Sequence, residues 1–230
     1  MGISALTTLL PLFPLLAVFG CAIPHVPSRT IYEDPVNYVR LELDDAVLPE
    51  WPPSHHAHPS AITADRMVRL LKGMTVQESR IWIQRWMQGE APLEPAFSDD
   101  EIALLAPRMA EAFSEAKYNE RVTFYLSQPQ TSVKRVITSG GLYLHGNELH
   151  VILGNWHIVY GIPTYGMIYD RRYPMRPTAA KGFDLMFQPA DAVRKQRHSF
   201  WDTIFANTKD ELVIDLQAVE QSAVAAIPLH

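Results

Sequence analysis

The hydrophobic pattern of this 230-residue chain changes its period near residue 120. Before that point apolar side chains recur every three or four residues, and from Arg121 onward they alternate with polar ones. The longer period places side chains on one face of a helix, whereas alternation places them on opposite faces of a strand. The alternating segments are 121–127, 133–138, 142–145 and 148–159. Helices are therefore predicted mainly in the first half and strands mainly in the second.

The residues Gly146 and Asn147 predict a two-residue turn between two of these strands, because both tolerate positive φ. Such a turn fixes the register of an antiparallel hairpin, so that Tyr143 faces His150 across it. Further strands are predicted at 36–43, 183–187 and 211–216. The Gly140-Gly141 pair predicts a break or a bulge.

Two helices are marked by capping signals. Thr63 is placed to cap the first, which Gly73 is expected to end. The second begins with a capping box at residues 98–101, and Pro107 inside it predicts a kink or a restart. Residues 76–88 carry both helical and strand signals, and the pattern leaves the choice open.

These elements predict an α+β fold. An antiparallel sheet of several strands, mainly from the C-terminal half, would pack against two or three helices, mainly from residues 60–117.

The first residues of the chain are apolar. Residues 3–19 carry no charged side chain, but Pro11 and Pro14 disfavour one continuous helix. The segment is also short for a spanning helix, which needs about 20 apolar residues. It is predicted to be a secretory signal peptide.

The run Val18-Phe19-Gly20-Cys21 resembles the lipobox of bacterial lipoproteins. The resemblance implies cleavage before Cys21 and attachment of fatty acyl chains such as palmitate to that residue. Each buried methylene contributes about 0.8 kcal/mol to membrane binding, so several chains make a firm anchor. Because Ala22 follows the cysteine, the resemblance implies a lipid-anchored envelope protein at the outer membrane, facing the periplasm. An ordinary buried thiol behind a signal peptide or short anchor is the alternative.

The predicted organisation follows from these signals. Residues 1–20 would be the signal peptide, 21–35 a proline-containing tether, 36–217 a globular α+β domain and 218–230 a C-terminal tail. A division of the domain near residue 120 is left open. The formal charge of −5 disfavours nucleic acid as a partner. Cys21 is the only cysteine, so if it is acylated no disulfide can form.

Histidines suggest one candidate site. The predicted hairpin places His145, Glu148 and His150 on one face, a combination that suits zinc or iron. His55 and His58, in a proline-flanked loop, could complete such a site. The competing interpretation is a solvated polar face opposite a buried apolar one. No cofactor is predicted, and zinc is the alternative.

Tyrosines and arginines suggest a second candidate site. Both residue types dominate binding hot spots, and loops often carry function. The predicted partner-contact residues are Tyr165, Tyr169, Arg171, Arg172, Tyr173 and Arg176. A loop packed on the sheet through its own aromatic rings is the alternative.

No nucleophile, phosphate-loop or dinucleotide motif occurs in the sequence. Asp44 and Asp45 are adjacent, so they should point apart and not form a glycosidase-like pair. The chain is therefore expected to be a binding, scaffold or accessory module with an envelope protein partner, and not an enzyme. The alternative is a metal-dependent hydrolase or metal-binding protein that uses the His/Glu cluster.

Overall fold

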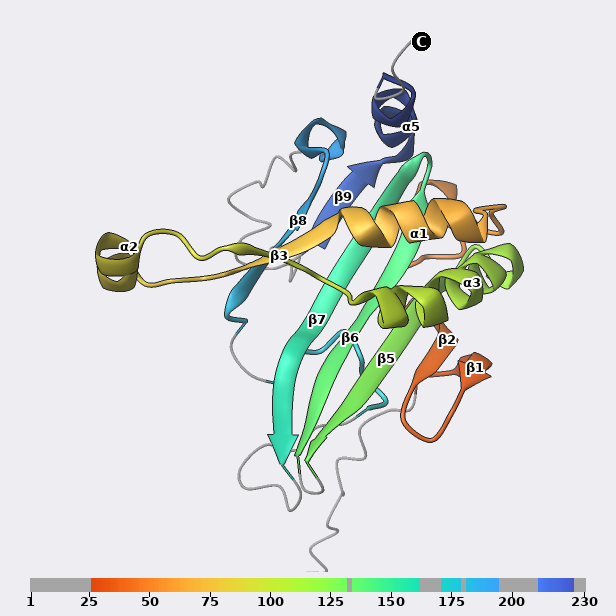
Figure 1. Cartoon of the computed structure of the whole chain (residues 1–230). Coiled ribbons are helices and arrows are strands. Elements are labelled where there is room, and N and C mark those ends of the chain that lie inside the picture. The colour runs from red at the N-terminus through yellow and green to blue at the C-terminus, as the bar shows by residue number, and fades with distance from the viewer. Residues whose placement is uncertain (1–25, 132–133, 162–170, 179–180, 195–210, 226–230) are drawn as a thin grey trace, which may run out of the picture.

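The computed structural model describes residues 26–131, 134–161, 171–178, 181–194 and 211–225 (Figure 1). Its strands are β1 (Ser28–Glu33), β2 (Tyr38–Leu43), β3 (Met74–Glu78), β4 (Leu93–Pro95), β5 (Glu120–Thr131), β6 (Lys134–His145), β7 (Glu148–Gly161), β8 (Phe183–Phe187) and β9 (Glu211–Asp215). Its α-helices are α1 (Ala64–Gly73), α2 (Trp82–Gln88), α3 (Asp99–Glu115) and α5 (Leu216–Ala225), and short 3-10 turns occupy Pro52–Ser54 and Ala190–Ala192.

The predicted α+β class is confirmed. Six strands form one antiparallel sheet in the order β1-β2-β5-β6-β7-β9. The β6–β7 hairpin has the predicted register, with Tyr143 opposite His150, and Gly146 adopts φ +57°. The predicted irregularity near Gly140 is also present, because the β6–β7 register shifts between Ser139 and Gly140.

Helices α1 and α3 cover one face of this sheet (Figure 1). Thr63 caps α1 by accepting a hydrogen bond from the Arg66 N–H, and the predicted capping box of α3 forms between Ser98 and Glu101. Of the two alternatives at Pro107, the restart is wrong, because α3 runs as one helix through that residue, and the kink stays a prediction. Its apolar stripe packs on the sheet on both sides of the proline, and this burial outweighs the lost backbone hydrogen bond.

The core fills the space between the two helices and the sheet. Side chains that are 0% exposed come from both layers: Val39, Leu41, Met67, Leu70, Leu105, Met109, Phe113, Val122, Phe124 and Leu149. The first and second halves of the chain therefore share one hydrophobic core.

A smaller sheet, in the order β4-β3-β8, carries a projecting arm. We define the arm as residues 74–95, which run out along β3, form α2 and return along β4 (Figure 1). The ambiguous residues 76–88 thus contain the end of a strand followed by a helix. Gly73 does not end α1 through a left-handed cap; a Cβ at Gly73 would lie 2.5 Å from the Phe187 ring. Its lack of a side chain serves close packing.

Both ends of the predicted domain are longer than expected. Residues 28–33, placed in the tether by the sequence, form β1, where Ile31 packs against the core and Arg29 pairs with Glu120 at 3.2 Å. Residues 218–225, predicted as tail, belong to α5, where Val219 packs against the core. The sequence analysis did not predict β1, because Ser28–Glu33 is a short segment in a region that contains Pro24, Pro27 and Pro35.

Candidate functional site

The outer face of the large sheet, opposite α1 and α3, gathers charged and aromatic side chains. Strand alternation separates the two faces: Leu149 and Val151 point into the core, while Tyr143 and His150 point outward. The outer-face array defined here consists of Asp44, His56, Arg121, Tyr143, His150 and Glu211. Its members come from four strands (β5, β6, β7 and β9) and two loops, so only the folded chain brings them together.

The first half of the array is centred on Asp44. Its carboxylate is hydrogen-bonded to His56 Nε2 at 3.0 Å and lies 3.3 Å from Arg121 Nη1. Burial alone would raise the pKa of Asp44, but the hydrogen bond from His56, the charge of Arg121 and the Ala46 N–H together hold this pKa below its ordinary value. Asp44 is therefore a buried, ionised acceptor.

The second half is centred on Tyr143 and His150. His150 Nδ1 lies 3.0 Å from Glu211 Oε1, and the Tyr143 hydroxyl is also hydrogen-bonded to Glu211. Burial, followed by this hydrogen bond and by the charges of Glu211 and Asp44, raises the pKa of Tyr143 well above its ordinary range. The tyrosine is thus held neutral as a hydrogen-bond donor.

Ring contacts join the two halves. The His56 ring lies 4.4 Å from the Tyr143 ring, which stacks on His150 at 4.6 Å between centroids. Within the described residues, the buried His56 Nδ1 and His150 Nε2 atoms have no hydrogen-bond partner. Each histidine therefore has one ring nitrogen held by a carboxylate and one with capacity for a further bond.

A hollow of about 430 Å³ lies beside this array. It is lined by Asp45, Arg121, Ile152, Leu153, Gly154, Met175, Arg176, Pro177 and Lys181. Three of these residues are cationic and one is acidic, so the lining carries excess positive charge although the whole chain is acidic. Charge of this sign, above an apolar floor, suits an anionic ligand group.

The segment 171–178 forms one wall of the hollow and is attached to the outer face of the sheet. Ser139 Oγ donates to the Pro174 carbonyl at 2.7 Å, and Asn155 Nδ2 donates to the Arg176 carbonyl at 3.0 Å. Gly154 allows this approach, because a Cβ there would lie 2.7 Å from backbone atoms of the segment. The segment therefore holds the Arg176 backbone in a fixed place.

The predicted partner-contact residues are only partly described. Tyr165 and Tyr169 lie outside the described residues. The Arg171 guanidinium lies over the rings of Tyr38 and Tyr125, and the Arg171 carbonyl accepts a hydrogen bond from Tyr38.

The Tyr173 ring has the guanidinium groups of Arg172 and Arg176 within 5.9 and 4.6 Å of its centroid. Packing on the sheet accounts for Arg171, whereas Arg172 and Arg176 are exposed.

The predicted metal ligands do not converge in the structure. His145 is exposed, and its ring centroid lies 6.2 Å from that of His150, whose Nδ1 is taken by Glu211. His58 accepts a hydrogen bond from the Leu144 N–H, and His55 packs against the Tyr118 ring.

The remaining predicted ligand, Glu148, lies 4.0 Å from His150 Nε2 and 3.5 Å from Arg194. Across the described residues, no three His, Cys, Asp or Glu side chains form a group that could hold a metal ion.

Cys21 lies outside the described residues, so the predicted lipid attachment is not part of this geometry. None of the helices in the described ranges is both long and apolar enough to cross a bilayer. Comparison of the chain with protein-family models, with curated proteins and with solved structures finds no match.

Sequence analysis missed most of the outer-face array. Asp44, Arg121 and Glu211 are far apart in the chain and belong to no motif, so spacing could not join them. One part of the array could be anticipated from the sequence. The adjacent carboxylates of Asp44 and Asp45 were predicted to point apart, and in the structure Asp44 is buried and Asp45 is exposed. His56 lies between His55 and His58 in the proline-flanked loop, but no signal in the sequence identified it as the partner of Asp44.

Proposed function

We propose that the protein is a lipid-anchored binding module of a bacterial cell envelope, held at the bilayer by acyl chains on Cys21. Its bound group is an anion, a phosphate or carboxylate presented by an envelope partner, which enters the hollow beside the outer-face array. The observation that carries the proposal is the lining of the hollow, which includes Arg121, Arg176 and Lys181 although the chain has a net charge of −5.

The surroundings of the histidines favour binding over nucleophilic catalysis. Within the described residues, His56 and His150 are hydrogen-bonded to carboxylates and to no hydroxyl group. A nucleophilic site needs a hydroxyl or thiol within hydrogen-bond reach of its base. Binding needs only cationic groups at the hollow, and the exposed guanidinium of Arg176 has the forked geometry that matches carboxylate and phosphate oxygens.

Thermal unfolding with inorganic phosphate as the probe tests the binding site. A ligand that binds only the folded state stabilises it by about 2.7 kcal/mol at 100 times its Kd. Phosphate, compared with chloride at equal ionic strength, should raise the unfolding temperature of the parent chain. Arg176→Gln should remove most of this increase.

Arg172→Gln is the matched control, because Arg172 is exposed in the same segment but does not line the hollow. An equal phosphate response in both variants would refute the anion site.

The anchor is tested separately. Cys21→Ser should abolish the acyl mass and release the protein from the membrane fraction; identical mass and fractionation of parent and variant would refute the lipid anchor.

A further inference from the structure

The tip of the arm exposes an unusual concentration of large apolar side chains. Trp82 and Trp86 in α2 are 76% and 84% exposed, and Ile81, Ile83 and Met87 are exposed beside them. Figure 1 shows α2 at the end of the arm, projecting from the body of the molecule. Soluble monomers rarely expose apolar patches of this kind, and such patches mark interaction sites.

The tip is held in a defined conformation. Seven residues are too few for a stable isolated helix. Here Arg80 Nη1 donates to the Gly89 carbonyl at 3.0 Å, Arg85 Nη2 donates to the Arg80 carbonyl at 3.2 Å, and Gly89 ends the helix with φ +75°. These bonds tie the two ends of α2 together, so the tryptophans are presented without burial of the helix.

The helix is also amphipathic. At 100° per residue, Trp82, Ile83, Trp86 and Met87 fall on one side, and Gln84, Arg85 and Gln88 fall on the other. An apolar face with anchors four residues apart is the pattern that docks in a protein groove.

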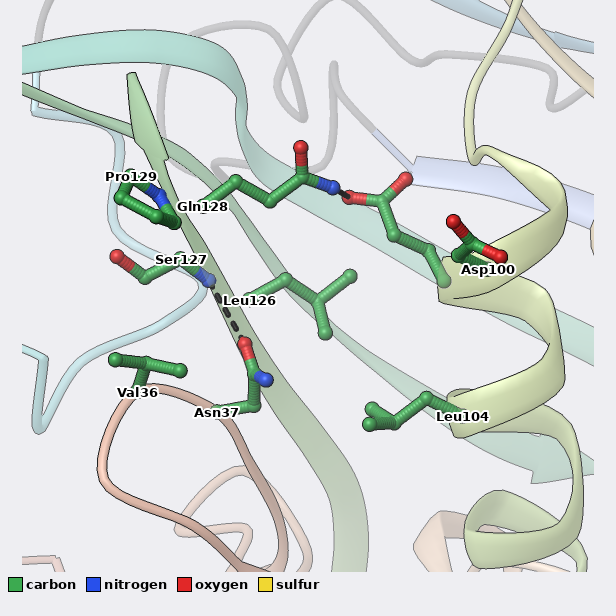
Figure 2. A pocket seen from close by; sticks show the side chains of 9 residues that line it. Val36, Asn37, Asp100, Leu104, Leu126, Ser127, Gln128 and Pro129 are labelled. Carbon is green, nitrogen blue, oxygen red and sulfur yellow. Dashed lines mark hydrogen bonds between the residues drawn. The ribbon is translucent and has the colours of Figure 1, made fainter. Parts of the chain in front are cut away.

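A second hollow on the same chain matches this helix. It measures about 270 Å³ and lies between α3, β5 and the turn before β2. In Figure 2, Leu104 and Leu126 lie on opposite sides of it, with Val36 and Pro129 beside β5. Its volume is below the ~300 Å³ where pockets for whole small molecules begin, so it suits one large side chain.

Charge at the two surfaces is complementary. Asp100 is exposed at the rim of the hollow, where it lies in the first turn of α3. On the polar side of α2, Arg85 is 54% exposed and has Glu90 at 3.6 Å. A guanidinium seated over Asp100 would orient the helix while a tryptophan fills the hollow.

We infer that α2 of one copy docks in the hollow between α3 and β5 of a second copy, and that the two copies exchange arms about a two-fold axis. In Figure 1 the arm points away from α3 and β5 of its own chain, so the occupant comes from another molecule. The two exposed tryptophans, one in the hollow and the other against the surface around it, offer roughly 400 Å² per arm. Two arms and the surfaces that they cover would bury on the order of 1,600 Å², the size of a standard stable interface.

A bilayer is the competing occupant, and the charge of the arm disfavours it. Helices that lie in a membrane interface carry polar faces rich in Lys and Arg. The arm contains three glutamates and two arginines, which gives a formal charge of −1. Anionic lipid would therefore gain no attraction from the arm as a whole, whereas the single exposed carboxylate of Asp100 can pair with Arg85 on the polar side of α2.

Sedimentation equilibrium of the full chain carrying Cys21→Ser, which removes association through acyl chains, tests this inference. The parent should be a dimer at micromolar concentration. Trp82→Ala with Trp86→Ala should raise the dimer dissociation constant at least 100-fold, because buried tryptophans dominate interfaces. Trp51→Ala, at a tryptophan 63% exposed outside the arm, is the matched control and should leave it unchanged.

A charge exchange identifies the receiving surface. Arg85→Glu and Asp100→Lys should each weaken the dimer about tenfold, and the two together in one chain should restore it. Circular dichroism checks that α3 survives; if it does not, Asp100→Asn alone should weaken the dimer, and a dimer that it leaves unchanged overturns the inference. The inference is overturned by a monomeric parent, by a dimer that survives loss of both tryptophans, or by failure of the exchanged pair to recover. A monomer that instead binds neutral phosphatidylcholine vesicles through α2 would assign the tip to the bilayer.

Discussion

The outer-face array and the tip of the arm differ in how the fold supports them. Asp44 and His56 are buried, and their neighbours come from strands distant in the chain. In contrast, α2 buries none of its residues, and its stabilising bonds stay within the arm. Residues of the array should therefore contribute strongly to folding, whereas the tip tryptophans should contribute almost nothing to the stability of the monomer.

This difference separates two ways of building a binding surface. At the array, substitution should remove stability, and at Arg121 also a charge that lines the hollow, because these side chains are buried and paired. At the tip, apolar side chains remain in water without an intramolecular benefit, so substitution should affect association alone. Pairs of variants test this difference: in each pair, one substitution is at a buried residue of the body and the other at an exposed residue of the arm or of the surface.

The largest effect is expected for tryptophan truncation in the body. Trp156 is 8% exposed, and its Nε1–H donates to the Ala96 carbonyl at 3.2 Å. Trp156→Ala should lower the free energy of unfolding by about 3–5 kcal/mol, because it leaves a cavity and an unpaired carbonyl. Trp86→Ala should change it by less than about 0.5 kcal/mol. Urea unfolding at a protein concentration that keeps the chain monomeric measures both; comparable losses would mean that the tip is part of the core.

Two adjacent carboxylates provide the next comparison. Asp44→Ala leaves Arg121 and His56 without their buried acceptor, so it should cost about 3 kcal/mol of unfolding free energy. Asp45→Ala removes an exposed carboxylate and should cost less than about 0.5 kcal/mol. Chemical denaturation of both variants at pH 7 gives the difference, and equal values would contradict a structural role for the Asp44 network.

Local patterns were enough to predict the elements that depend on near neighbours. The hairpin register and the Ser98–Glu101 capping box are set by residues next to each other in the chain, and both are confirmed. Pro107 shows the limit of such rules: the proline allowed a restart, but α3 continues through it with apolar residues buried on both sides.

The candidate site was less accessible to sequence reasoning. Sequence reasoning singled out residues in the 55–58 loop and on the β6–β7 hairpin, but the metal hypothesis grouped His55 and His58 with His145, Glu148 and His150. The structure instead gives His56 and His150 separate carboxylate partners, Asp44 and Glu211. Such partners are chosen by the order of strands in the sheet, which no local pattern encodes.

His58 should make folding sensitive to pH. Burial, with a smaller effect from the charge of His56, lowers the pKa of His58 from its ordinary value of 6.5 to about 4. Because the folded-state pKa is the lower one, the unfolded chain binds the proton first, and stability present above pH 6.5 is lost as the pH falls toward 4. Between pH 7 and pH 5 this loss should be about 2 kcal/mol.

His58→Gln removes the titration while its amide oxygen can still accept from the Leu144 N–H, so it should flatten the pH dependence over this range. The comparison uses urea midpoints at pH 5, 6 and 7. An unchanged slope in the glutamine variant would assign the pH dependence to other groups.

The smallest change in stability is expected where segment 171–178, the wall of the hollow beside the outer-face array, is attached to the sheet. A Cβ at Gly154 would lie 2.7 Å from the Pro174 carbonyl oxygen and the Met175 carbonyl carbon. Gly154→Ala should therefore push segment 171–178 away from the sheet and cost about 1–2 kcal/mol of unfolding free energy. Gly182→Ala, where a Cβ meets nothing within 4 Å, is the matched control.

Because the same segment positions Arg176, Gly154→Ala should also reduce the thermal stabilisation by phosphate, and Gly182→Ala should not. Lost stability with an intact phosphate response would mean that Arg176 binds without its anchored backbone, and that the hollow is a less rigid site than its hydrogen bonds indicate.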